Sequence, residues 1–337
     1  MRKIILFLMC VLMLSSCSGE AKKAEQTIFA MDTAMSITVY GDNAELLAAN
    51  AAHKVNELSA KWSVTDQNSE IGNANSIGAH ISTAHISDET AELIKFSLEL
   101  TEQTGGAFDI TIYPVLREWG FTTGEYNIPS EKRIAELLRK TGSDKIQLSG
   151  NTITLLGGAQ LDLGAVAKGY TGDILCEYLK SEGVTSALLD LGGNIHALGT
   201  KPDGTPWRVG VKAPDGSGNV AVLEMADSAA VTSGGYERYF VGEDGKRYCH
   251  ILDPETGYPA DSGLASVTII GREGKLCDAL STAVYVMGAS EAEELWRSRG
   301  DFEMLLLTNN GDMLVTAGLQ ERLSVDESFS GELKIIK

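Results

Sequence analysis

Asp278 and Thr282 form the pair of side chains whose spacing suits metal chemistry most directly. They stand four residues apart in the segment LCDALST (276–282), so a helix would place both on one face. A carboxylate and a hydroxyl oxygen in this arrangement suit a hard cation such as Mg²⁺, with phosphate and water completing the octahedron. The alternative is a solvated Asp beside a Thr that bonds its own helix backbone, and the segment alone leaves both interpretations open.

The segment LDLGAVAKGYTGD (161–173) has the order strand, glycine, helix that can bind a phosphate. A strand would end at Asp162-Leu163 and a helix would begin near Ala165. Free backbone N–H groups at such a helix start bind anions, and Lys168 could reach the same anion. The segment lacks both the GxxxxGK[ST] signature of a P-loop and the GxGxxG signature of a dinucleotide fold. A capped helix with an exposed lysine therefore remains the alternative.

A third segment, RYCHILDPETGYP (247–259), embeds His250 among polar residues and glycine. An imidazole there could act as a general base or as a donor that positions a ligand, although a structural role is also open. A fourth segment, GGAFDITIYPVLREWGF (105–121), carries four aromatic residues that could either line a pocket for a flat ring or belong to the core. They are Phe108, Tyr113, Trp119 and Phe121.

The composition limits what these residues can serve. The chain has 337 residues, a formal net charge of −18 and 36 glycines. Such an acidic protein is not expected to bind nucleic acid, and a polyphosphate ligand would need a metal or local Lys and Arg. No GxSxG, HExxH, CxxC or EF-hand pattern is present, which argues against a serine hydrolase, a zinc peptidase or a thioredoxin-like oxidoreductase.

Helices and hairpins alternate irregularly along the chain, which predicts an α+β fold rather than a regular βαβ repeat. Apolar periodicity predicts six helices, over Asn43–Trp62, Asp88–Gln103, Ser130–Lys140, Ala165–Ser181, Leu276–Met287 and Ser290–Arg299. Strands are predicted at Met35–Tyr40, in hairpins over 146–155 and 302–316, and throughout 187–270. No Pro- or Ser-rich linker divides the chain, so one compact unit is expected.

The N-terminus reads as a processed segment. Arg2 and Lys3 precede an unbroken apolar run, Ile4–Leu14, which is too short to span a bilayer and typical of a signal peptide. The sequence Leu14-Ser15-Ser16-Cys17 resembles a bacterial lipobox, which implies that Cys17 is diacylated and becomes the first mature residue; an ordinary signal peptide with a chance Cys is the alternative. We expect residues 1–16 to be a lipoprotein signal peptide, 17–27 a lipidated Cys with a flexible tether, and 28–337 the folded domain.

Three cysteines then remain, Cys176, Cys249 and Cys277, and they are expected to be packed or free thiols. Cys249 and Cys277 each precede a candidate functional residue by one position, so close packing is the main expectation and a disulfide the alternative.

Taken together and in order, the motifs resemble the ApbE family, the FAD:protein FMN transferases. The resemblance runs from about residue 28 to 319. It is carried by Met31-Asp32-Thr33, Trp62, Ser69-Glu70-Ile71, Asn75, GGAFDITIYP (105–114), Trp119-Gly120-Phe121, LDLGAVAKGY (161–170), LDLGGN (189–194), TSGGYERYF (232–240), HILDPETGYP (250–259) and CDALSTA (277–283). Two positions depart from the family pattern: Asp32 replaces a usual Gly, and Trp62 replaces a common Tyr.

The resemblance implies a single compact T-fold-related domain of mixed, largely antiparallel sheets with packed helices. It also implies a reaction, the Mg²⁺-dependent transfer of FMN from FAD, through its phosphate, to a Thr or Ser of an acceptor protein, with AMP leaving. Asp278 and Thr282 match the family's metal-ligand positions, and Ala165 matches a carbonyl ligand. The positions matched to FAD contacts are Met31, Trp62, Ala107, Phe108, Asp109, Asp162, Lys168 and Ile251.

Within this resemblance, His250 would deprotonate the acceptor hydroxyl, and Mg²⁺ held by Asp278 would stabilise the developing charge. Two alternatives share the same site: a Mg²⁺-dependent FAD pyrophosphatase releasing FMN and AMP, and a non-catalytic flavin-binding lipoprotein. The expected acceptor is a flavoprotein subunit of a membrane redox pump or an extracytoplasmic flavin-carrying domain. The expected location is a membrane anchor facing the periplasm or extracytoplasmic space.

Overall fold

A computed structural model describes residues 21–76 and 80–337. The expected signal peptide and the lipidated Cys17 lie outside the described residues. Within the described part, no helix combines the length and apolarity needed to cross a membrane.

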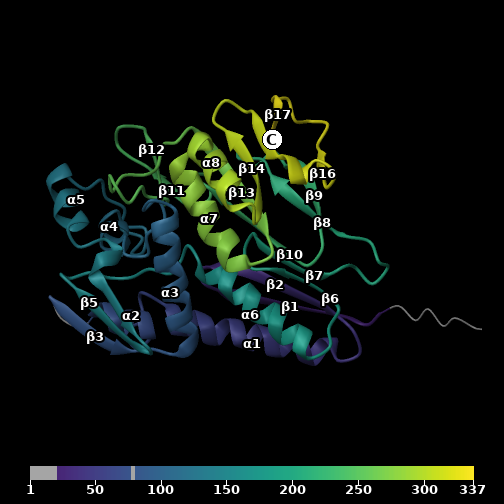
Figure 1. Cartoon of the computed structure of the whole chain (residues 1–337), viewed down its shortest axis with the longest axis horizontal. Helices are drawn as coiled ribbons and strands as arrows, with labels where there is room; N and C mark the ends of the chain where they lie inside the picture. The colour runs from purple at the N-terminus through teal and green to yellow at the C-terminus, as the bar shows by residue number, and fades with distance from the viewer. Residues whose placement is uncertain (1–20, 77–79) are drawn as a thin grey trace, which may run out of the picture.

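A nine-stranded sheet forms the centre of the molecule, in the order β1-β2-β6-β7-β10-β13-β14-β15-β17 (Figure 1). Every neighbouring pair in this sheet is antiparallel except β15 with β17, which are parallel. Its strands are β1 (Lys23–Ala30), β2 (Thr33–Tyr40), β6 (Ser186–Asp190), β7 (Asn194–Gly199), β10 (Ser228–Gly234), β13 (Leu264–Gly271), β14 (Phe302–Thr308), β15 (Met313–Thr316) and β17 (Leu333–Ile336).

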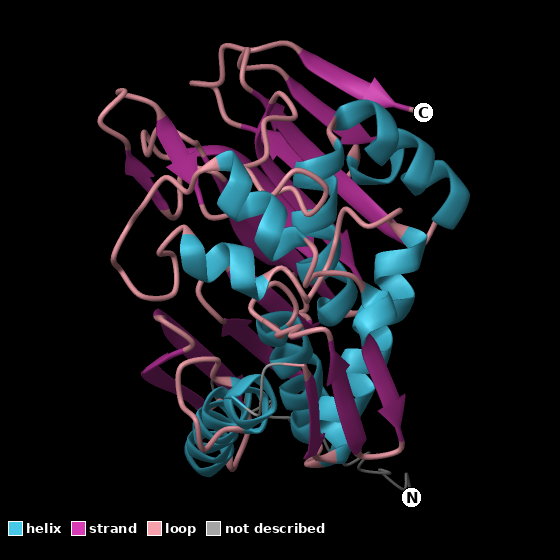
Figure 2. Ribbon diagram, turned by 90° about the vertical axis from the view of Figure 1, so that its left-hand side faces the viewer, coloured by secondary structure: helices cyan, strands magenta, loops and turns pink. Residues whose placement is uncertain are grey.

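Helices cover one face of this sheet, and Figure 2 shows helices in front of its long strands. The side chains of β2 and β6 alternate, so that Ile37 and Leu189 pack toward the helices while Tyr40 and Leu188 face the other side. The helices are α1 (Ala44–Trp62), α2 (Glu70–Ser76), α3 (Asp88–Gln103), α4 (Tyr113–Glu118), α5 (Glu131–Leu138), α6 (Ala167–Ser181), α7 (Gly274–Met287) and α8 (Ala289–Arg299), with short 3₁₀ turns at Ser143–Lys145 and Ala317–Leu319.

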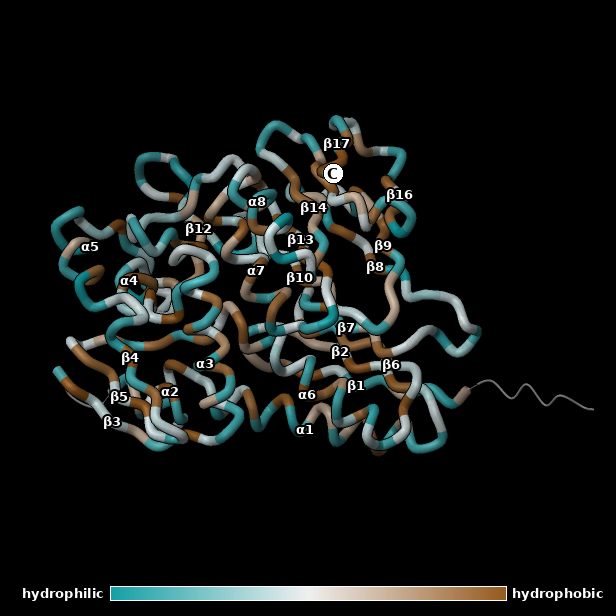
Figure 3. Tube along the Cα trace, viewed as in Figure 1, coloured by the Kyte–Doolittle hydropathy of each residue, from teal (hydrophilic) through white to brown (hydrophobic). Residues whose placement is uncertain are grey.

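A three-stranded sheet, β16-β9-β8, packs against the opposite face through Trp207, Val211 and Leu223. Two further small sheets, β3-β5-β4 and β11-β12, lie beside the helices. These strands are β3 (Ile81–His85), β4 (Ile146–Ser149), β5 (Thr152–Leu156), β8 (Trp207–Lys212), β9 (Asn219–Met225), β11 (Tyr239–Val241), β12 (Arg247–Cys249) and β16 (Leu323–Val325). Figure 3 shows hydrophobic segments along the central strands and hydrophilic ones in the outer loops.

The α+β prediction and the largely antiparallel sheets are therefore confirmed. The helices predicted at Asn43–Trp62, Asp88–Gln103 and Ser290–Arg299 correspond to α1, α3 and α8 to within one residue at each end. The helix predicted from Ala165 begins two residues later, at Ala167, because residues 164–166 form a turn.

The tether boundary at residue 27 is wrong. Residues 23–27 form the first part of β1, which pairs with β2 from Lys23↔Tyr40 to Ala30↔Thr33. Ala24 and Ile28 on one side of β1 pack against the core beneath α1, while Lys23, Glu25 and Thr27 are exposed. Polar residues at alternate positions of an edge strand resemble a flexible polar segment in sequence, which explains the error.

Met31 and Asp32 form the two-residue turn between β1 and β2. Both have positive φ, 48° and 60°, as the turns that match the twist of a hairpin require. The Met31 amide donates to Ser59 Oγ of α1 at 3.3 Å. Asp tolerates this region better than most residues, so Asp32 occupies the left-handed conformation that a glycine would adopt easily.

Candidate functional site

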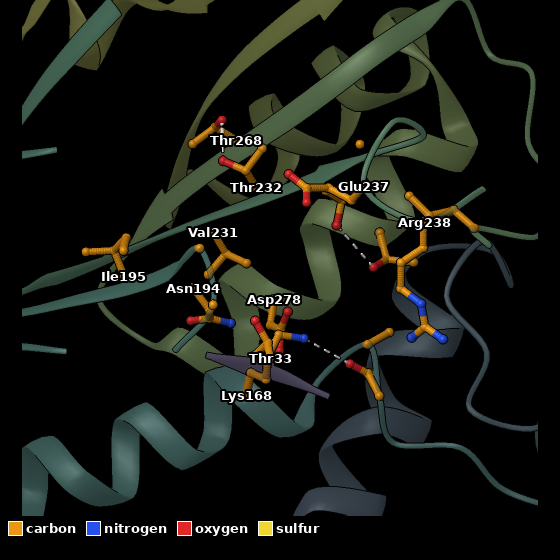
Figure 4. A pocket seen from close by; sticks show the side chains of 18 of the residues that line it. Thr33, Lys168, Asn194, Ile195, Val231, Thr232, Glu237, Arg238, Thr268 and Asp278 are labelled. Carbon is orange, nitrogen blue, oxygen red and sulfur yellow. Dashed lines mark hydrogen bonds between the residues drawn. The ribbon is translucent and has the colours of Figure 1, made fainter. Parts of the chain in front are cut away.

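A cavity of about 860 Å³ lies where the β1–β2 turn, the start of α6, the β6–β7 turn and α7 meet. Residues from segments far apart in sequence line it; among them are residues 107–110, 162, 164–165, 168, 190, 192–195, 208–212, 230–234, 236–238 and 250–252. Figure 4 shows Asp278 at its centre, with Lys168 and Thr33 beside it and Arg238 to one side.

Asp278 lies on α7 with its side chain directed into this cavity, and only 4 % of the residue is exposed. Its Oδ2 accepts a hydrogen bond from the Gly169 amide at 2.8 Å. Its Oδ1 has no hydrogen bond to any residue in the described part of the chain. A carboxylate that is buried but only half satisfied has the capacity to bind a cation or another donor.

Two glycines at the crossing of α6 and α7 make this contact possible. A Cβ added at Gly169 would lie 2.2 Å from the Gly274 carbonyl oxygen and 2.7 Å from the Asp278 Cβ. The two helices can therefore approach closely enough for an amide of α6 to hold a carboxylate of α7 only because both positions lack side chains.

Replacing Gly169 with Ala is expected to force the two helices apart. The overpacking should lower the free energy of unfolding by about 1–3 kcal/mol, and it should reduce the FMN transfer that the resemblance implies because Asp278 loses its fixed position. Denaturant unfolding and an activity assay on the same preparation measure both effects. The control is Glu177→Ala, at an exposed position of the same helix. A Gly169→Ala protein as stable and active as that control would contradict this account.

Thr282 and Ala165 line the same cavity as Asp278, so all three positions matched to metal ligands are brought together. Thr282 Oγ1 lies 3.5 Å from Ser233 Oγ, which in turn is 2.7 Å from Ser281 Oγ. A carboxylate, a hydroxyl and a backbone carbonyl are hard oxygen donors, which fit Mg²⁺. Across residues 21–76 and 80–337, no cluster of three His, Cys, Asp or Glu could hold a metal. Such a site would therefore have one carboxylate and depend on substrate oxygens and water for the rest.

The sequence predicted that free backbone amides at the start of α6 bind a phosphate, and for three of these amides the prediction is wrong. The amides of Val166 and Ala167 donate to the Leu163 carbonyl at 3.0 and 2.8 Å, and the Gly169 amide donates to Asp278. They are not free to bind an anion. Lys168 itself lines the cavity, with its Nζ 3.4 Å from the Gly164 carbonyl.

Asp162 lies beside Lys168 in the cavity wall, and its Oδ1 accepts from the Gly164 amide at 2.7 Å. Burial raises the pKa of Asp162, against the opposing effect of that hydrogen bond and of Arg238 and Lys168. Burial likewise raises the pKa of Asp109, although Thr111 donates to it twice, at 2.7 and 2.6 Å.

His250 follows β12 and lines the cavity next to Ile251. Its backbone amide and its Nδ1 both lie within hydrogen-bond distance of the Arg238 carbonyl, at 3.0 and 3.1 Å. Because a carbonyl only accepts, Nδ1 carries the proton and Nε2 has a free lone pair. Burial, with the charges of Arg238 and Lys168, lowers the pKa of His250 to about 4. The imidazole is therefore a neutral base at pH 7.

If His250 is the general base, activity should fall only at a pH well below the ordinary pKa range of histidine. The folded protein keeps this imidazole neutral until the pH falls through about 4, so the acid limb of kcat/KM should have its midpoint near that pH. An unfolded chain would take up the proton already near pH 6.5, so this group increasingly destabilises the folded state as the pH falls from about 6.5 to about 4, and the full penalty remains below pH 4. Rates measured from about pH 3 to 8, with circular dichroism to verify folding at each pH, test this. A midpoint near 6.5 would contradict it.

Arg238 is a cavity residue that the sequence analysis did not single out. It lies in the motif TSGGYERYF, and its guanidinium donates to the Phe121 carbonyl at 2.6 Å while its own carbonyl fixes His250. Thr232, Ser233 and Glu237 of the same motif also line the cavity. The motif itself was visible in sequence, but which of its side chains face a ligand depends on where β10 ends.

Of the positions matched to FAD contacts, the cavity collects Met31, Ala107, Phe108, Asp109, Asp162, Lys168 and Ile251. Trp62 does not line it. The Trp62 ring stacks on Tyr170 at 5.9 Å, and its Nε1 donates to Thr90 Oγ1 at 2.9 Å, so this residue serves the core. Trp119 and Phe121 are also core residues, because they pack with Phe240 in a separate cluster. Of the two roles considered for them, the core role is therefore confirmed and the role of lining a ring pocket is wrong.

Cys176, Cys249 and Cys277 are free thiols, and the latter two are buried. The prediction of packed or free thiols is confirmed. Burial raises the pKa of all three, so none is a reactive thiolate at neutral pH.

Comparison with known proteins agrees with this geometry. The family model described as ApbE family matches residues 31–306. Proteins named FAD:protein FMN transferase are 33 % identical in Klebsiella pneumoniae, over 71 % of this chain and 75 % of the relative, and 29 % identical in Vibrio cholerae, over 86 % and 88 %.

Solved structures are similar over almost the whole described chain. The ApbE protein of Thermotoga maritima superposes with a TM-score of 0.81 at 32 % identity, covering 91 % of this chain and 98 % of that one. The apo form of the flavinyl transferase ApbE of Pseudomonas stutzeri gives 0.80 at 30 %, covering 90 % and 97 %. These matches, over most of both sequence and fold, show that this chain is an enzyme of the ApbE family.

Proposed function

We propose that this enzyme transfers FMN from FAD to a Thr or Ser hydroxyl of an acceptor flavoprotein and releases AMP, with Mg²⁺ as cofactor. The observation that carries the proposal is the half-satisfied carboxylate of Asp278, which shares one cavity with His250 and with seven of the eight positions matched to FAD contacts, Lys168 among them. Relatives named FAD:protein FMN transferase support the reaction class.

The reaction balances without any further reactant. The acceptor oxygen forms a bond to the phosphorus of the FMN half, and the bond from that phosphorus to the bridging oxygen breaks. The hydroxyl proton passes to His250 Nε2, which lacks its own proton because Nδ1 is bound to the Arg238 carbonyl. The proton then leaves with AMP, and the base is regenerated.

Substrate charge is the main obstacle in so acidic a chain, whose net charge is −18. Lys168 and Arg238 supply positive charge inside the cavity. Asp278, Thr282 and the Ala165 carbonyl would hold Mg²⁺, which when bound neutralises pyrophosphate charge. Asp278 is suited to this because the Gly169 amide fixes one of its oxygens and leaves the other available.

The pyrophosphatase alternative uses water in place of the acceptor hydroxyl. Incubation with FAD and Mg²⁺, with and without acceptor, separates the two by quantifying AMP and free FMN chromatographically. Transfer predicts that AMP appears in step with acceptor and that little free FMN forms without it. Rapid release of both FMN and AMP in the absence of acceptor would identify a pyrophosphatase instead.

We also propose that the chain is a lipoprotein anchored at Cys17 to a membrane, with its domain in the periplasm or extracytoplasmic space. The acceptor would then be a flavoprotein subunit of a membrane redox pump or an extracytoplasmic flavin-carrying domain. Metabolic labelling with radioactive palmitate tests the anchor, with Cys17→Ser as the variant. The wild-type chain should take up label and fractionate with membranes, while equal labelling of the variant would rule out this anchor.

A further inference from the structure

One part of the cavity, here called its arm, is lined by β8, a strand that carries none of the positions matched to FAD contacts. Five consecutive residues of β8, from Arg208 to Lys212, line this arm. Leu188, Ile195 and Ala230 of the large sheet also line the cavity. These three pack with the core on the side of that sheet that faces β8 and β9, the face away from the helices.

The backbone edge of β8 faces this arm. Side chains alternate between the two sides of a strand, so five residues in a row can line one cavity only where it runs along the strand edge. β8 is the last strand in the order β16-β9-β8 and pairs only with β9. The other edge therefore offers unpaired N–H and C=O groups, which an extended peptide can bind as an added strand.

The arm connects to Asp278 past the start of β7. β10 pairs with β7 only from Ser228 to Val231, because β7 begins at Asn194, opposite Val231. Thr232, Ser233 and Gly234 continue β10 beside β13 alone, and all three line the cavity. Figure 4 shows Asn194 and Val231 between Asp278 and Ile195. The cavity thus runs from the helix-covered face of the sheet, past the start of β7, to the β8 edge.

Two cations mark this arm. Arg208 and Lys212 are exposed and alternate with the buried Trp207 and Val211, so both project from the exposed side of β8. Neither side chain makes a hydrogen bond or an ion pair within the described part of the chain. Even Glu224, directly across from Arg208 on β9, forms no ion pair with it. Unpaired cations beside the site of such an acidic protein favour an acidic partner.

We infer that the acceptor polypeptide binds as an extended strand along the free edge of β8, with carboxylate side chains facing Arg208 and Lys212. Its hydroxyl then reaches Asp278 around the start of β7. A peptide backbone matches the alternating N–H and C=O groups of this edge, whereas the adenylate half of FAD has no such repeat. This inference rests on the proposed function, because it assigns the second substrate of that reaction.

The test is the full-length double variant Arg208→Glu/Lys212→Glu, with steady-state constants measured for both substrates. The acceptor is a flavin-carrying domain that the wild-type chain modifies. We expect the KM for acceptor to rise at least about tenfold, equivalent to 1.4 kcal/mol. The KM for FAD should stay within about twofold of the wild-type value. The control, Lys95→Glu/Arg297→Glu, changes the charge equally at exposed positions on α3 and α8 and should leave both constants unchanged.

Charge rescue makes the test specific. An acceptor with Asp or Glu near the modified hydroxyl replaced by Lys should regain affinity for the double variant. A rise in the KM for FAD would assign the arm to the adenylate half and overturn the inference, and unchanged constants for both substrates would overturn it as well. If the wild-type chain modifies no flavin-carrying domain, the proposed function fails first, and the wild-type control reveals this separately.

Discussion

Replacing Asp278 with Asn is expected to lower FMN transfer by about 10²- to 10³-fold at saturating FAD, the range for loss of one electrostatic stabiliser at a reacting centre. The Asn oxygen can still accept from the Gly169 amide, which Asp278 Oδ2 accepts at 2.8 Å, so the packing of α6 on α7 should persist. Only the negative charge is removed. Initial rates measured against Mg²⁺ concentration should show both the lower maximum and a weakened dependence on the metal.

Glu294→Gln is the matched control, because it removes one carboxylate charge at an exposed position of α8. Its rates should equal those of the wild type. Asp278→Asn with transfer within tenfold of wild type and an unchanged Mg²⁺ titration would show that Asp278 neither holds the metal nor stabilises the reaction. Thermal unfolding of the same preparations separates that result from a folding defect.

Replacing His250 with Gln is expected to lower the maximal transfer rate by about 10²- to 10⁴-fold, the usual contribution of a general base. The Gln amide can donate to the Arg238 carbonyl, as Nδ1 does at 3.1 Å, but it has no basic nitrogen to receive the acceptor proton. The KM for FAD should change little. Single-turnover flavinylation of an acceptor measures the chemical step.

His53→Gln provides the comparison for that variant, because His53 lies on α1 with 76 % of its side chain exposed. Transfer by His250→Gln at a rate close to that of His53→Gln would remove His250 from the role of base. Its place beside Arg238 would then be structural.

The elements of this fold could be predicted from sequence where apolar residues recur at a regular spacing. The α1 and α3 segments carry apolar residues at helical spacing, so their ends could be placed almost exactly. The ends of β1 could not be placed in this way, because an edge strand with polar residues on one side has only a weak alternation of apolar and polar residues. The order of the nine strands also could not be predicted from local sequence patterns, because β10 pairs with β7 and β13, which are distant from it in sequence.

In the site, too, local spacing could be predicted from sequence, whereas contacts between distant segments could not. The spacing of Asp278 and Thr282 indicated one helix face, and the structure places both in the cavity. The sequence could not show that Gly169 on a different helix would bind the Asp278 carboxylate, because that contact joins residues 109 positions apart. Trp62 was assigned to flavin by its place in a motif, yet its hydrogen bond to Thr90 holds it in the core. A local motif does not specify which way a ring points.

The β6–β7 turn illustrates a third limit. Gly192 and Gly193 have positive φ, 73° and 85°, and a Cβ at Gly192 would lie 2.4 Å from Thr33 atoms of the neighbouring β2. The motif LDLGGN predicted close approach of backbone or ligand at this point. Only the fold reveals that β7 begins after this turn, at Asn194, which leaves Thr232 to Gly234 of β10 without a partner on that side and lets the cavity reach the far face of the sheet.

Mass spectrometry of the acceptor tests the central claim most directly. A flavin-carrying domain incubated with this enzyme, FAD and Mg²⁺ should gain the mass of FMN less one water on a Thr or Ser, with one AMP released per modified domain. Asp278→Asn should leave the acceptor almost unmodified under the same conditions. An acceptor of unchanged mass, in a reaction that releases free FMN and AMP, would contradict the assignment of this enzyme as an FMN transferase.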